Sequence, residues 1–360
     1  MGFSRVIETF RILSLKIFEL VNCFIYLSNK ILLKKMQLIK ANYKIIPQKP
    51  GIQGIYEQAE LPGRICYGSQ DKIAPGTAEK FVKRLMQSNH GAPLEHNGVY
   101  LDCPKRVYDK YVNNKYSKTS YHKTGETYTV PYKGYLEEVT KYYVSTNLRV
   151  LFENGWLDDL RYVVEPTQYH EKRITVAFTI DRFTGEEFLR HRVASFNRES
   201  TRYVNFSKDK FGSGDIKFIT PPWVGDNIKA IDDKKFRELC YSIYIGEDYD
   251  EFSDILYWLF SLKASEYSYN NLIRLGWQPQ QARTVLPCAI NSPLIKTAFV
   301  SDWCHFFNLR ALGTTGTPHP QAKELAEPLM NEFISKGLVK LIENPKETQR
   351  TNIPFICTKL

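Results

Sequence analysis

The chain has 360 residues, of which 43% are hydrophobic, 14% aromatic and 24% charged, so it buries a substantial core and is a globular protein. Its 49 Lys and Arg residues against 39 Asp and Glu residues leave a net charge of +10, which favours anionic partners: nucleotides, nucleic acid or an acidic membrane surface. The seven scattered cysteines have no CxxC spacing, so they indicate neither a disulfide framework nor a zinc ribbon and resemble the reduced thiols of a cytosolic, cytoplasmic protein.

Residues 1–35 form an apolar N-terminal extension that stands outside the fold prediction. Lys16, Glu19 and Lys30 interrupt its run of Ile, Leu and Phe, so it lacks the roughly 20 uninterrupted apolar residues of a membrane span. No small-residue cleavage site of a signal peptide follows. Three interpretations are open: an amphipathic helix that docks on the protein or on a membrane surface, a partner-binding extension, or a non-native leader before an internal start at Met36.

From Gln37 onward the pattern is that of an α+β protein. Residues 38–46 read as a strand, and Thr77–Ser88 read as a helix with Phe81, Leu85 and Met86 on one face. A loop from His90 to His96 then leads into a short strand. The two histidines have no further ligand at suitable spacing, so we expect them to be hydrogen-bonded or solvated and we expect no metal site.

Residues 102–172 are rich in tyrosine and lysine, and their middle, 141–151, fits either a strand or a short helix. Aromatic residues between basic ones can form a surface for single-stranded nucleic acid. The alternative is a solvated insertion whose tyrosines lie at an interface. Residues 173–182 follow, and they alternate with period two, which predicts a strand with one buried face.

The stretch from Phe188 to Tyr203 combines four arginines, one histidine and three Ser or Thr residues. Leu189, Val193 and Phe196 have the i, i+4, i+7 spacing of a buried helical stripe, so we expect a helix. Arginine without lysine suggests forked recognition of phosphate or another planar anion, because guanidinium has rigid donors and stays charged.

The second half of the chain is mostly helical. A strand is expected at 216–220, helices between 234 and 275, and an amphipathic helix at 320–335 with Leu325, Leu329 and Phe333 in one line. Two arginine-bearing stretches lie between them, at 281–287 and 304–310.

Several common catalytic motifs are absent from the sequence. It has no GxGxxG after a strand, no P-loop, no GxSxG and no HExxH. Ser200 and His191 are nine positions apart on the expected helix, which disfavours a nucleophile and base in contact. A serine hydroxyl that hydrogen-bonds an anion is the better interpretation.

The order Arg190–His191–Arg192, seven further residues and then Ser200 resembles the signature of the flavin-dependent thymidylate synthases. Thr201–Arg202–Tyr203 continue it. The resemblance covers most of the chain from about Met36, which implies one catalytic domain over residues 36–360 with an insertion at about 102–150. The implied fold is α+β, with a central mixed or antiparallel sheet and flanking helices, assembled as a homotetramer whose active sites are shared between subunits.

The resemblance also implies a reaction without a cysteine nucleophile. Methylenetetrahydrofolate supplies a one-carbon unit that passes through FAD to C5 of dUMP, NADPH reduces the flavin, and dTMP is formed. Nucleic acid and membranes are not expected as partners.

Residue roles follow from the same resemblance. Arg310 is the implied catalytic residue, because it favours the uracil ring ionised at N3. The implied dUMP-binding residues are Glu187, Arg190, Arg198, Glu199, Ser200, Thr201, Arg202, Arg283 and Arg310. The implied FAD-binding residues are His90, Ala92, Glu95, Arg190, His191, Arg192, Arg198, His305 and His319.

The sequence departs from the family pattern at several positions. Arg198 stands where glutamate is common and Glu199 follows it, so either residue can fill that role. Glu187 replaces a glutamine, Cys66 replaces a serine, and an expected Asn and Arg are missing at 299–301. Two alternatives to the synthase are therefore a basic nucleic-acid-binding protein and a homologue that binds flavin and nucleotide without turnover.

Overall fold

The computed structural model describes residues 36–130, 133–202, 205–206, 216–225, 227–245, 253–341 and 355–357, and side chains among these outside 124–138, 244–245 and 355–357. The N-terminal extension and Tyr203 lie outside the described residues. The strands are β1 (Gln37–Lys40), β2 (Asn42–Ile46), β3 (Val99–Cys103), β4 (Lys118–Val130), β5 (Lys133–Thr146), β6 (Arg173–Thr179), β7 (Ser195–Arg198), β8 (Lys217–Thr220), β9 (Leu294–Phe299), β10 (Val339–Leu341) and β11 (Phe355–Cys357). The α-helices are α2 (Gly51–Cys66), α3 (Thr77–Gln87), α4 (Lys105–Tyr111), α5 (Leu148–Glu153), α6 (Arg182–Leu189), α7 (Asp233–Ile245), α8 (Asp254–Arg274), α9 (Pro279–Ala282), α10 (Val300–Arg310) and α11 (Pro320–Ser335).

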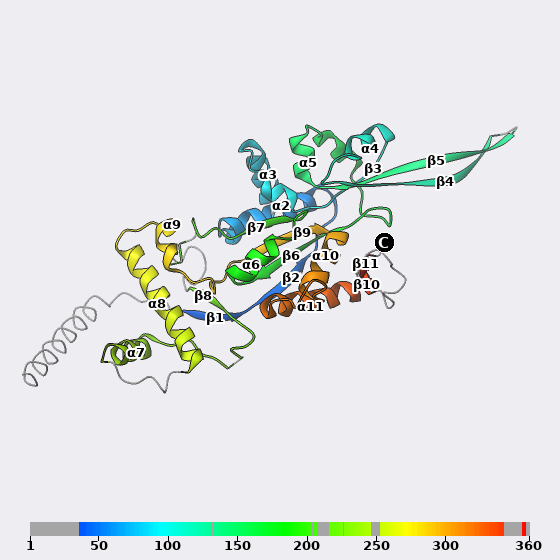
Figure 1. The fold of residues 1–360 in the computed structure, drawn as a ribbon. Helices are drawn as coiled ribbons and strands as arrows, with labels where there is room; N and C mark the ends of the chain where they lie inside the picture. The colour runs from blue at the N-terminus through cyan, green and yellow to red at the C-terminus, as the bar shows by residue number, and fades with distance from the viewer. Residues whose placement is uncertain are drawn as a thin grey trace, which may run out of the picture.

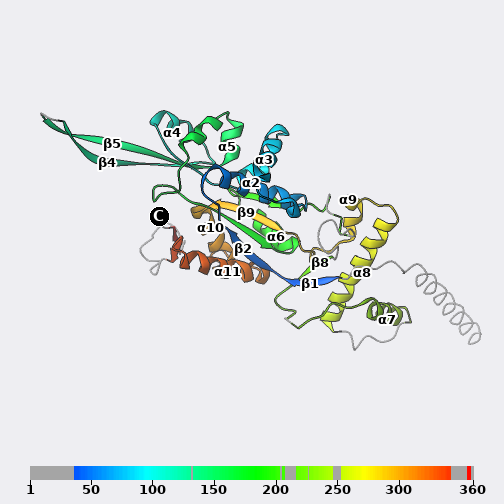
Figure 2. The same cartoon turned by 180° about the vertical axis from the view of Figure 1, so that it is seen from behind.

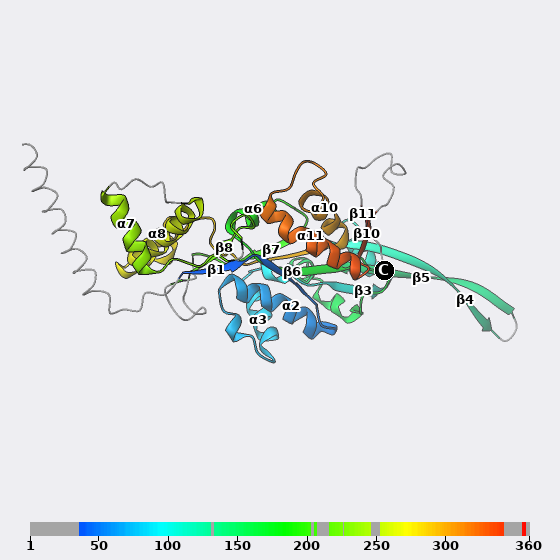
Figure 3. The same cartoon turned by 90° about the horizontal axis from the view of Figure 1, so that it is seen from below.

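A four-stranded antiparallel sheet in the order β2-β6-β9-β7 lies at the centre of the fold. Helices α6, α10 and α11 cover one face, and α2 and α3 lie on the other side (Figures 1 and 3). The alternating pattern at 173–182 is confirmed as β6, which pairs with β2 and β9. The expected α+β architecture with an antiparallel central sheet is therefore present.

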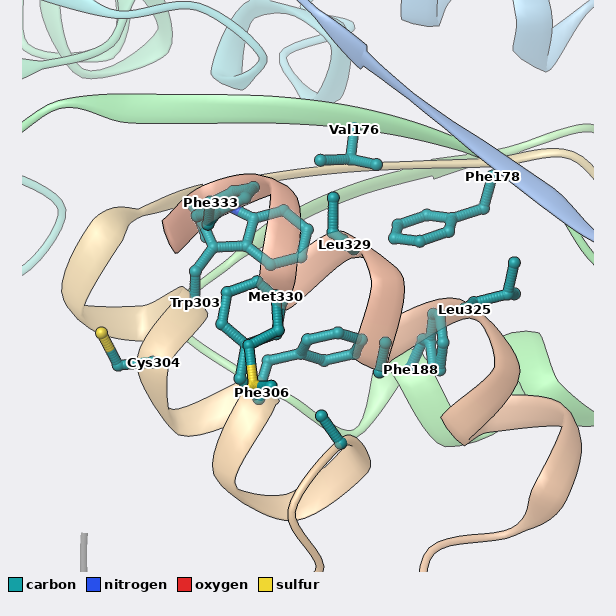
Figure 4. Packing of buried hydrophobic residues seen from close by; sticks show 14 of the residues in the cluster. Val176, Phe178, Phe188, Trp303, Cys304, Phe306, Leu325, Leu329, Met330 and Phe333 are labelled. Carbon is teal, nitrogen blue, oxygen red and sulfur yellow. The ribbon is translucent and has the colours of Figure 1, made fainter. Parts of the chain in front are cut away.

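An aromatic core fills the space between this sheet and the helices α10 and α11. Trp303, Phe306 and Phe333 are fully buried there, and Figure 4 shows them packed around Met330 beside Phe188 of α6. The i, i+4, i+8 line predicted for Leu325, Leu329 and Phe333 is confirmed, because α11 buries that face. This packing holds the C-terminal ends of α6 and α10 together.

The expected insertion contains a long two-stranded ribbon that sequence patterns did not predict. β4 and β5 pair from Lys118↔Ser145 to Val130↔Lys133, and only the base of β5 pairs with β3. The ribbon extends away from the rest of the described residues (Figures 1 and 2). The stretch 141–151, for which the sequence allowed a strand or a short helix, contains one of each: the end of β5 and then α5.

A third group of elements lies at the opposite end from the ribbon. Helices α7 and α8 confirm the helical prediction for this region, and α8 packs near the parallel pair β1–β8 (Figure 1). Leu259, Leu262 and Tyr269 of α8 form a core with Phe218 of β8. In α7 the side chain of Leu239 is buried, whereas that of Ile243 is exposed.

The helix expected over residues 188–203 is wrong. Helix α6 is capped by Asp181, whose side chain accepts a hydrogen bond from Thr184 N, and it ends at Leu189. Val193 is 58% exposed and has a φ of 71°, which a β-branched residue rarely adopts. The chain then enters β7, which pairs with β9. Backbone pairing with a distant strand therefore overrides the apolar spacing of the segment.

Two further findings concern membranes and thiols. None of the helices in the described ranges is long and apolar enough to cross a membrane. Cys66, Cys103, Cys240 and Cys288 are free, as expected, whereas Cys304 is disulfide-bonded, so the expectation of reduced thiols is wrong for that residue.

Candidate functional site

The ends of α6 and α10 bring three of the predicted site residues into one hydrogen-bonded cluster. Arg310 Nε donates to His191 Nε2 at 3.0 Å. Its Nη1 donates to the Glu187 carboxylate at 2.5 Å, and its Nη2 donates to the Glu187 backbone oxygen at 3.2 Å. Glu187 and Arg310 are 123 positions apart in the chain, so the fold gathers residues that only the family resemblance had grouped.

Aromatic packing against Phe306 holds the Glu187–His191–Arg310 cluster in place. The ring of Phe306 lies 4.8 Å from that of Phe188 in α6 and 5.0 Å from the imidazole of His191. Figure 4 shows Phe188 and Phe306 together within the core. Because both rings are fully buried, the position of Arg310 relative to Glu187 depends on the core and not on a mobile loop.

His191 is electrically neutral in this setting. Burial lowers its pKa to about 3, and the charges of Lys296 and Arg310 act in the same direction. Since Nε2 accepts from Arg310, the ring proton resides on Nδ1. That atom is buried and has no hydrogen-bond partner among the described residues. An unpaired buried donor is costly, so this nitrogen is available to a bound ligand.

Lys296 of β9 is a neighbour that sequence reasoning missed. Its side chain is fully buried, and Nζ lies 4.0 Å and 4.2 Å from the ring centroids of Phe306 and Trp303. Nζ has no hydrogen-bond partner within the described part of the chain. Burial lowers the Lys296 pKa well below its ordinary value. In the sequence, a buried lysine was indicated only by its position inside the otherwise largely apolar run LIKTAF.

Arg198 lies against α6. Its Nη1 pairs with the Glu186 carboxylate at 2.7 Å, while Nε and Nη2 are buried without a partner among the described residues. A Cβ atom at Gly185 would lie only 2.0 Å from Arg198 Nη2, so glycine at this position permits the close approach. This arginine is therefore enclosed by the helix whose end carries Glu187.

Glu199 has different surroundings from Arg198. Burial raises the pKa of its carboxyl to about 7, with the charge of Lys217 opposing the shift. Burial raises the pKa of the Cys66 thiol, and the Glu199 charge adds to the shift. Ser200 N donates to the Cys66 backbone oxygen at 3.1 Å. The side chains of Arg198 and Glu199 thus meet different partners.

A second group of predicted residues meets at the end of the arginine-rich segment. Arg283, in the 3-10 helix η5 (Arg283–Val285), donates from Nη1 to the Thr201 hydroxyl at 3.0 Å. Arg202 N donates to the Ser200 hydroxyl at 3.3 Å. Arg190 and Arg202 are exposed. The guanidinium of Arg283 and the hydroxyls of Ser200 and Thr201, which all suit an anion, thus lie in this segment of the fold.

A cavity of about 500 Å³ lies beside β7 and the turn that precedes it. Arg173 Nη2 donates to the Glu95 backbone oxygen at 2.8 Å, and the Glu95 carboxylate pairs with Arg149. Arg173 Nε is buried without a partner among the described residues. The cavity lining includes Glu95, Arg149, Arg173, Arg192, Phe196 and Phe299.

The predicted flavin residues are only partly brought together. Glu95 and Arg192 share the cavity, and Ala92 lies with Glu95 in the 3-10 helix η2 (Ala92–Glu95). The exposed His305 has its ring 5.7 Å from His191. His90 contacts Tyr67, and the exposed His319 lies 5.8 Å from Trp223, so these two stand apart from the cavity lining.

His96 was not among the predicted site residues, yet it is fully buried beside the cavity wall. Its Nδ1 lies 2.9 Å from the Thr297 hydroxyl, and burial lowers its pKa to about 3. This bears out the expectation of a hydrogen-bonded histidine. Across the described residues no group of three or more His, Cys, Asp or Glu side chains is arranged to hold a metal ion.

Comparison with known proteins connects this region to a family. Residues 166–336 match the family model described as thymidylate synthase complementing protein. A flavin-dependent thymidylate synthase from Geobacter sulfurreducens is 28% identical over 131 residues, which cover 36% of this chain and 44% of the relative. One from Corynebacterium diphtheriae is 30% identical over 132 residues, or 37% and 46% of the two chains. The chain therefore matches about half the length of these curated relatives.

Among solved structures, a UMP/dUMP methylase, PolB, from Streptomyces cacaoi bound with 5-Br dUMP aligns with a TM-score of 0.33 and 16% identity. The alignment covers 83% of this chain and 92% of that one, and at this TM-score it is only a weak likeness. The sequence matches are the stronger finding, and the residues matched by the family model include Glu187, His191 and Arg310. Residues 166–336 are therefore similar to the thymidylate synthase complementing protein family, and the curated relatives matched in sequence are flavin-dependent thymidylate synthases.

Proposed function

We propose that the protein methylates dUMP reductively to dTMP, with methylenetetrahydrofolate as one-carbon donor, FAD as carrier and NADPH as reductant. The observation that carries the proposal is the Glu187–His191–Arg310 cluster inside the matched region. It holds a permanent cation at the end of α10. A prepositioned cation stabilises negative charge that develops on a pyrimidine ring, and it does so without reorganising during the reaction.

The second group of side chains suits the nucleotide phosphate. Arg283 and Thr201 are already hydrogen-bonded to each other, with Ser200 and Arg202 adjacent. A phosphate dianion accepts forked hydrogen bonds from guanidinium groups, and the hydroxyls add further donors. We assign this group to the dUMP phosphate and the Arg310 cluster to the uracil ring.

The cavity beside β7 is chemically suited to the flavin. Its volume lies within the range of about 300–1,000 Å³ that is common for ligand pockets. Phe196 and Phe299 provide an aromatic wall for a planar ring, while Arg173 and Arg192 provide cationic donors for phosphate. Glu95 and Arg192 would hold the group, which when bound supplies the hydride and one-carbon chemistry. The protein's own part is to orient the reactants and exclude water.

A homotetramer with shared active sites is part of the proposal. The predicted site residues occupy several places in one chain, and His305, His319 and Arg190 are exposed in it. Neighbouring subunits would bring such surfaces together. Anionic nucleotides that neutralise these arginines would then stabilise the assembly.

The test uses the full chain purified with its flavin. We expect bound flavin, a change in its visible absorbance on addition of dUMP, and dTMP formation that requires methylenetetrahydrofolate and NADPH. NADPH oxidation without dTMP would instead identify a homologue that binds both ligands but does not turn over. DNA binding with a steep salt dependence and no bound flavin would overturn the proposal in favour of nucleic-acid binding.

A further inference from the structure

Glu187 uses its carboxylate and its backbone oxygen on the same guanidinium. Arginine has five N–H donors, and three of those of Arg310 are engaged: one with His191 and two with Glu187. Both terminal nitrogens of Arg310 therefore point at one residue. The side chains are 18% and 29% exposed, so the pair lies where a ligand can reach it.

The pair has a direct electrostatic consequence. Among the ion pairs of the described residues, Glu187 is the acidic partner of Arg310, while His191 beside it is neutral. The carboxylate therefore offsets the charge that a pyrimidine anion would need. It also places a like charge next to any anionic ligand, and like charges side by side oppose binding.

We infer that Glu187 is a specificity-determining residue that gates Arg310: an anionic pyrimidine nucleotide has to displace its carboxylate before occupying the guanidinium. The bonds from Arg310 to His191 and to the Glu187 backbone oxygen do not involve this carboxylate. Arg310 therefore stays in place when the carboxylate leaves, and the motion required is a rotation of one side chain. The choice of a pyrimidine nucleotide as ligand rests on the proposed function; the gating of Arg310 does not.

Calorimetric titration of dUMP into the full-length chain tests the inference. Glu187→Gln keeps the shape but removes the charge, and we expect it to bind dUMP about tenfold more tightly than the unmodified protein. Glu187→Asp keeps the charge and should gain clearly less affinity for dUMP than Glu187→Gln. Glu327→Gln removes a charge from an exposed pair with Lys323 and should have no effect. The gate would be overturned if Glu187→Gln bound dUMP no more tightly than the unmodified protein does. It would also be overturned if Glu187→Asp gained as much affinity for dUMP as Glu187→Gln.

A second measurement needs no nucleotide. Phenylglyoxal modifies accessible guanidinium groups, and peptide mass spectrometry reports the rate at Arg310. We expect this rate to rise several-fold in Glu187→Gln and to be unchanged in Glu327→Gln, with circular dichroism confirming that each variant is folded. Equal rates of Arg310 modification in Glu187→Gln and in the unmodified protein would refute the gate, irrespective of the dUMP titration. Faster modification without dUMP binding in any variant would support the gate and refute the dUMP assignment.

Discussion

At the scale of single residues, Arg310 shows how the site is organised. Its guanidinium is held by hydrogen bonds to Glu187 and His191, and His191 can accept because burial keeps it neutral. The same surroundings leave His191 Nδ1 without a partner among the described residues. A fixed cation next to an unpaired donor is an arrangement suited to a ligand that carries negative charge.

Replacing Arg310 by alanine should abolish dTMP formation while leaving the protein folded. The side chain lies at the last residue of α10 and not inside the aromatic core, so its loss removes charge without opening a core cavity. We expect at least about a 10²-fold fall in turnover. Product analysis with circular dichroism measures both effects, and Arg310→Lys tests whether charge without the fork suffices. Full turnover in Arg310→Ala would exclude the assigned role.

Glu199 makes stability depend on pH. Its pKa is about 7 in the folded chain against an ordinary value of 4.5, so the folded state holds this proton more tightly than the unfolded state does. Stability contributed by this group therefore falls as pH rises from about 4.5 to 7. Glu199→Gln should lose that decrease and be more stable than the unmodified protein at pH 8. Urea unfolding at pH 5 and pH 8 measures this, and an identical decrease in both proteins would contradict it.

At the scale of elements, the ribbon β4–β5 is separable from the rest of the fold. Its base is tied to β3 through residues 142–146, and beyond Tyr142 the strand β5 pairs with β4 only. Isolated two-stranded ribbons contribute little stability of their own. Its length therefore serves something other than the stability of the central sheet.

Shortening the ribbon tests this separation. Replacing residues 125–138 by Asn-Gly keeps the pair Thr124↔Val139 and closes it with a two-residue turn. We expect the melting temperature to change little, because the pairing of β3 with β5 is retained. Scanning calorimetry measures it. A large fall would show that the outer ribbon stabilises the described fold, and light scattering on the same sample would report a change in assembly.

At the scale of the whole molecule, Lys296 places a basic side chain in the aromatic core between the central sheet and the helices α10 and α11. Its ammonium lies against two rings and has no hydrogen-bond partner among the described residues, and burial opposes its charge. Buried ionic groups often reduce stability relative to apolar residues of similar size. This core also supports the Arg310 cluster through Phe306.

Lys296→Met should raise the free energy of unfolding by about 1–4 kcal/mol, because it removes the cost of burying the ammonium while keeping the side-chain volume. Urea unfolding at neutral pH measures the change. The exposed Lys340→Met on β10 serves as the control and should be nearly neutral. A loss of stability in Lys296→Met would mean that the contacts with Trp303 and Phe306 outweigh the cost of burial.

Patterns within the sequence predicted the type and the buried face of single helices and strands. Period-two alternation indicated β6, and helical spacing indicated α3 and α11, because burial of one face leaves a local periodic trace. The triplet at 190–192 with Ser200 indicated the family whose model matches residues 166–336. β9 was missed, since a short apolar run such as LIKTAF does not distinguish a buried strand from a helix.

What only the tertiary structure decided is how distant elements meet. The segment 188–203 has helical spacing, yet it becomes the end of α6, a turn and β7, because β9 offers backbone partners about 100 positions away. The pairing of Glu187 with Arg310 likewise depends on two helix ends that the aromatic core holds together. Local sequence records which face of an element is buried. Which residue meets which depends on packing between elements, and that packing places a carboxylate directly on the proposed catalytic arginine.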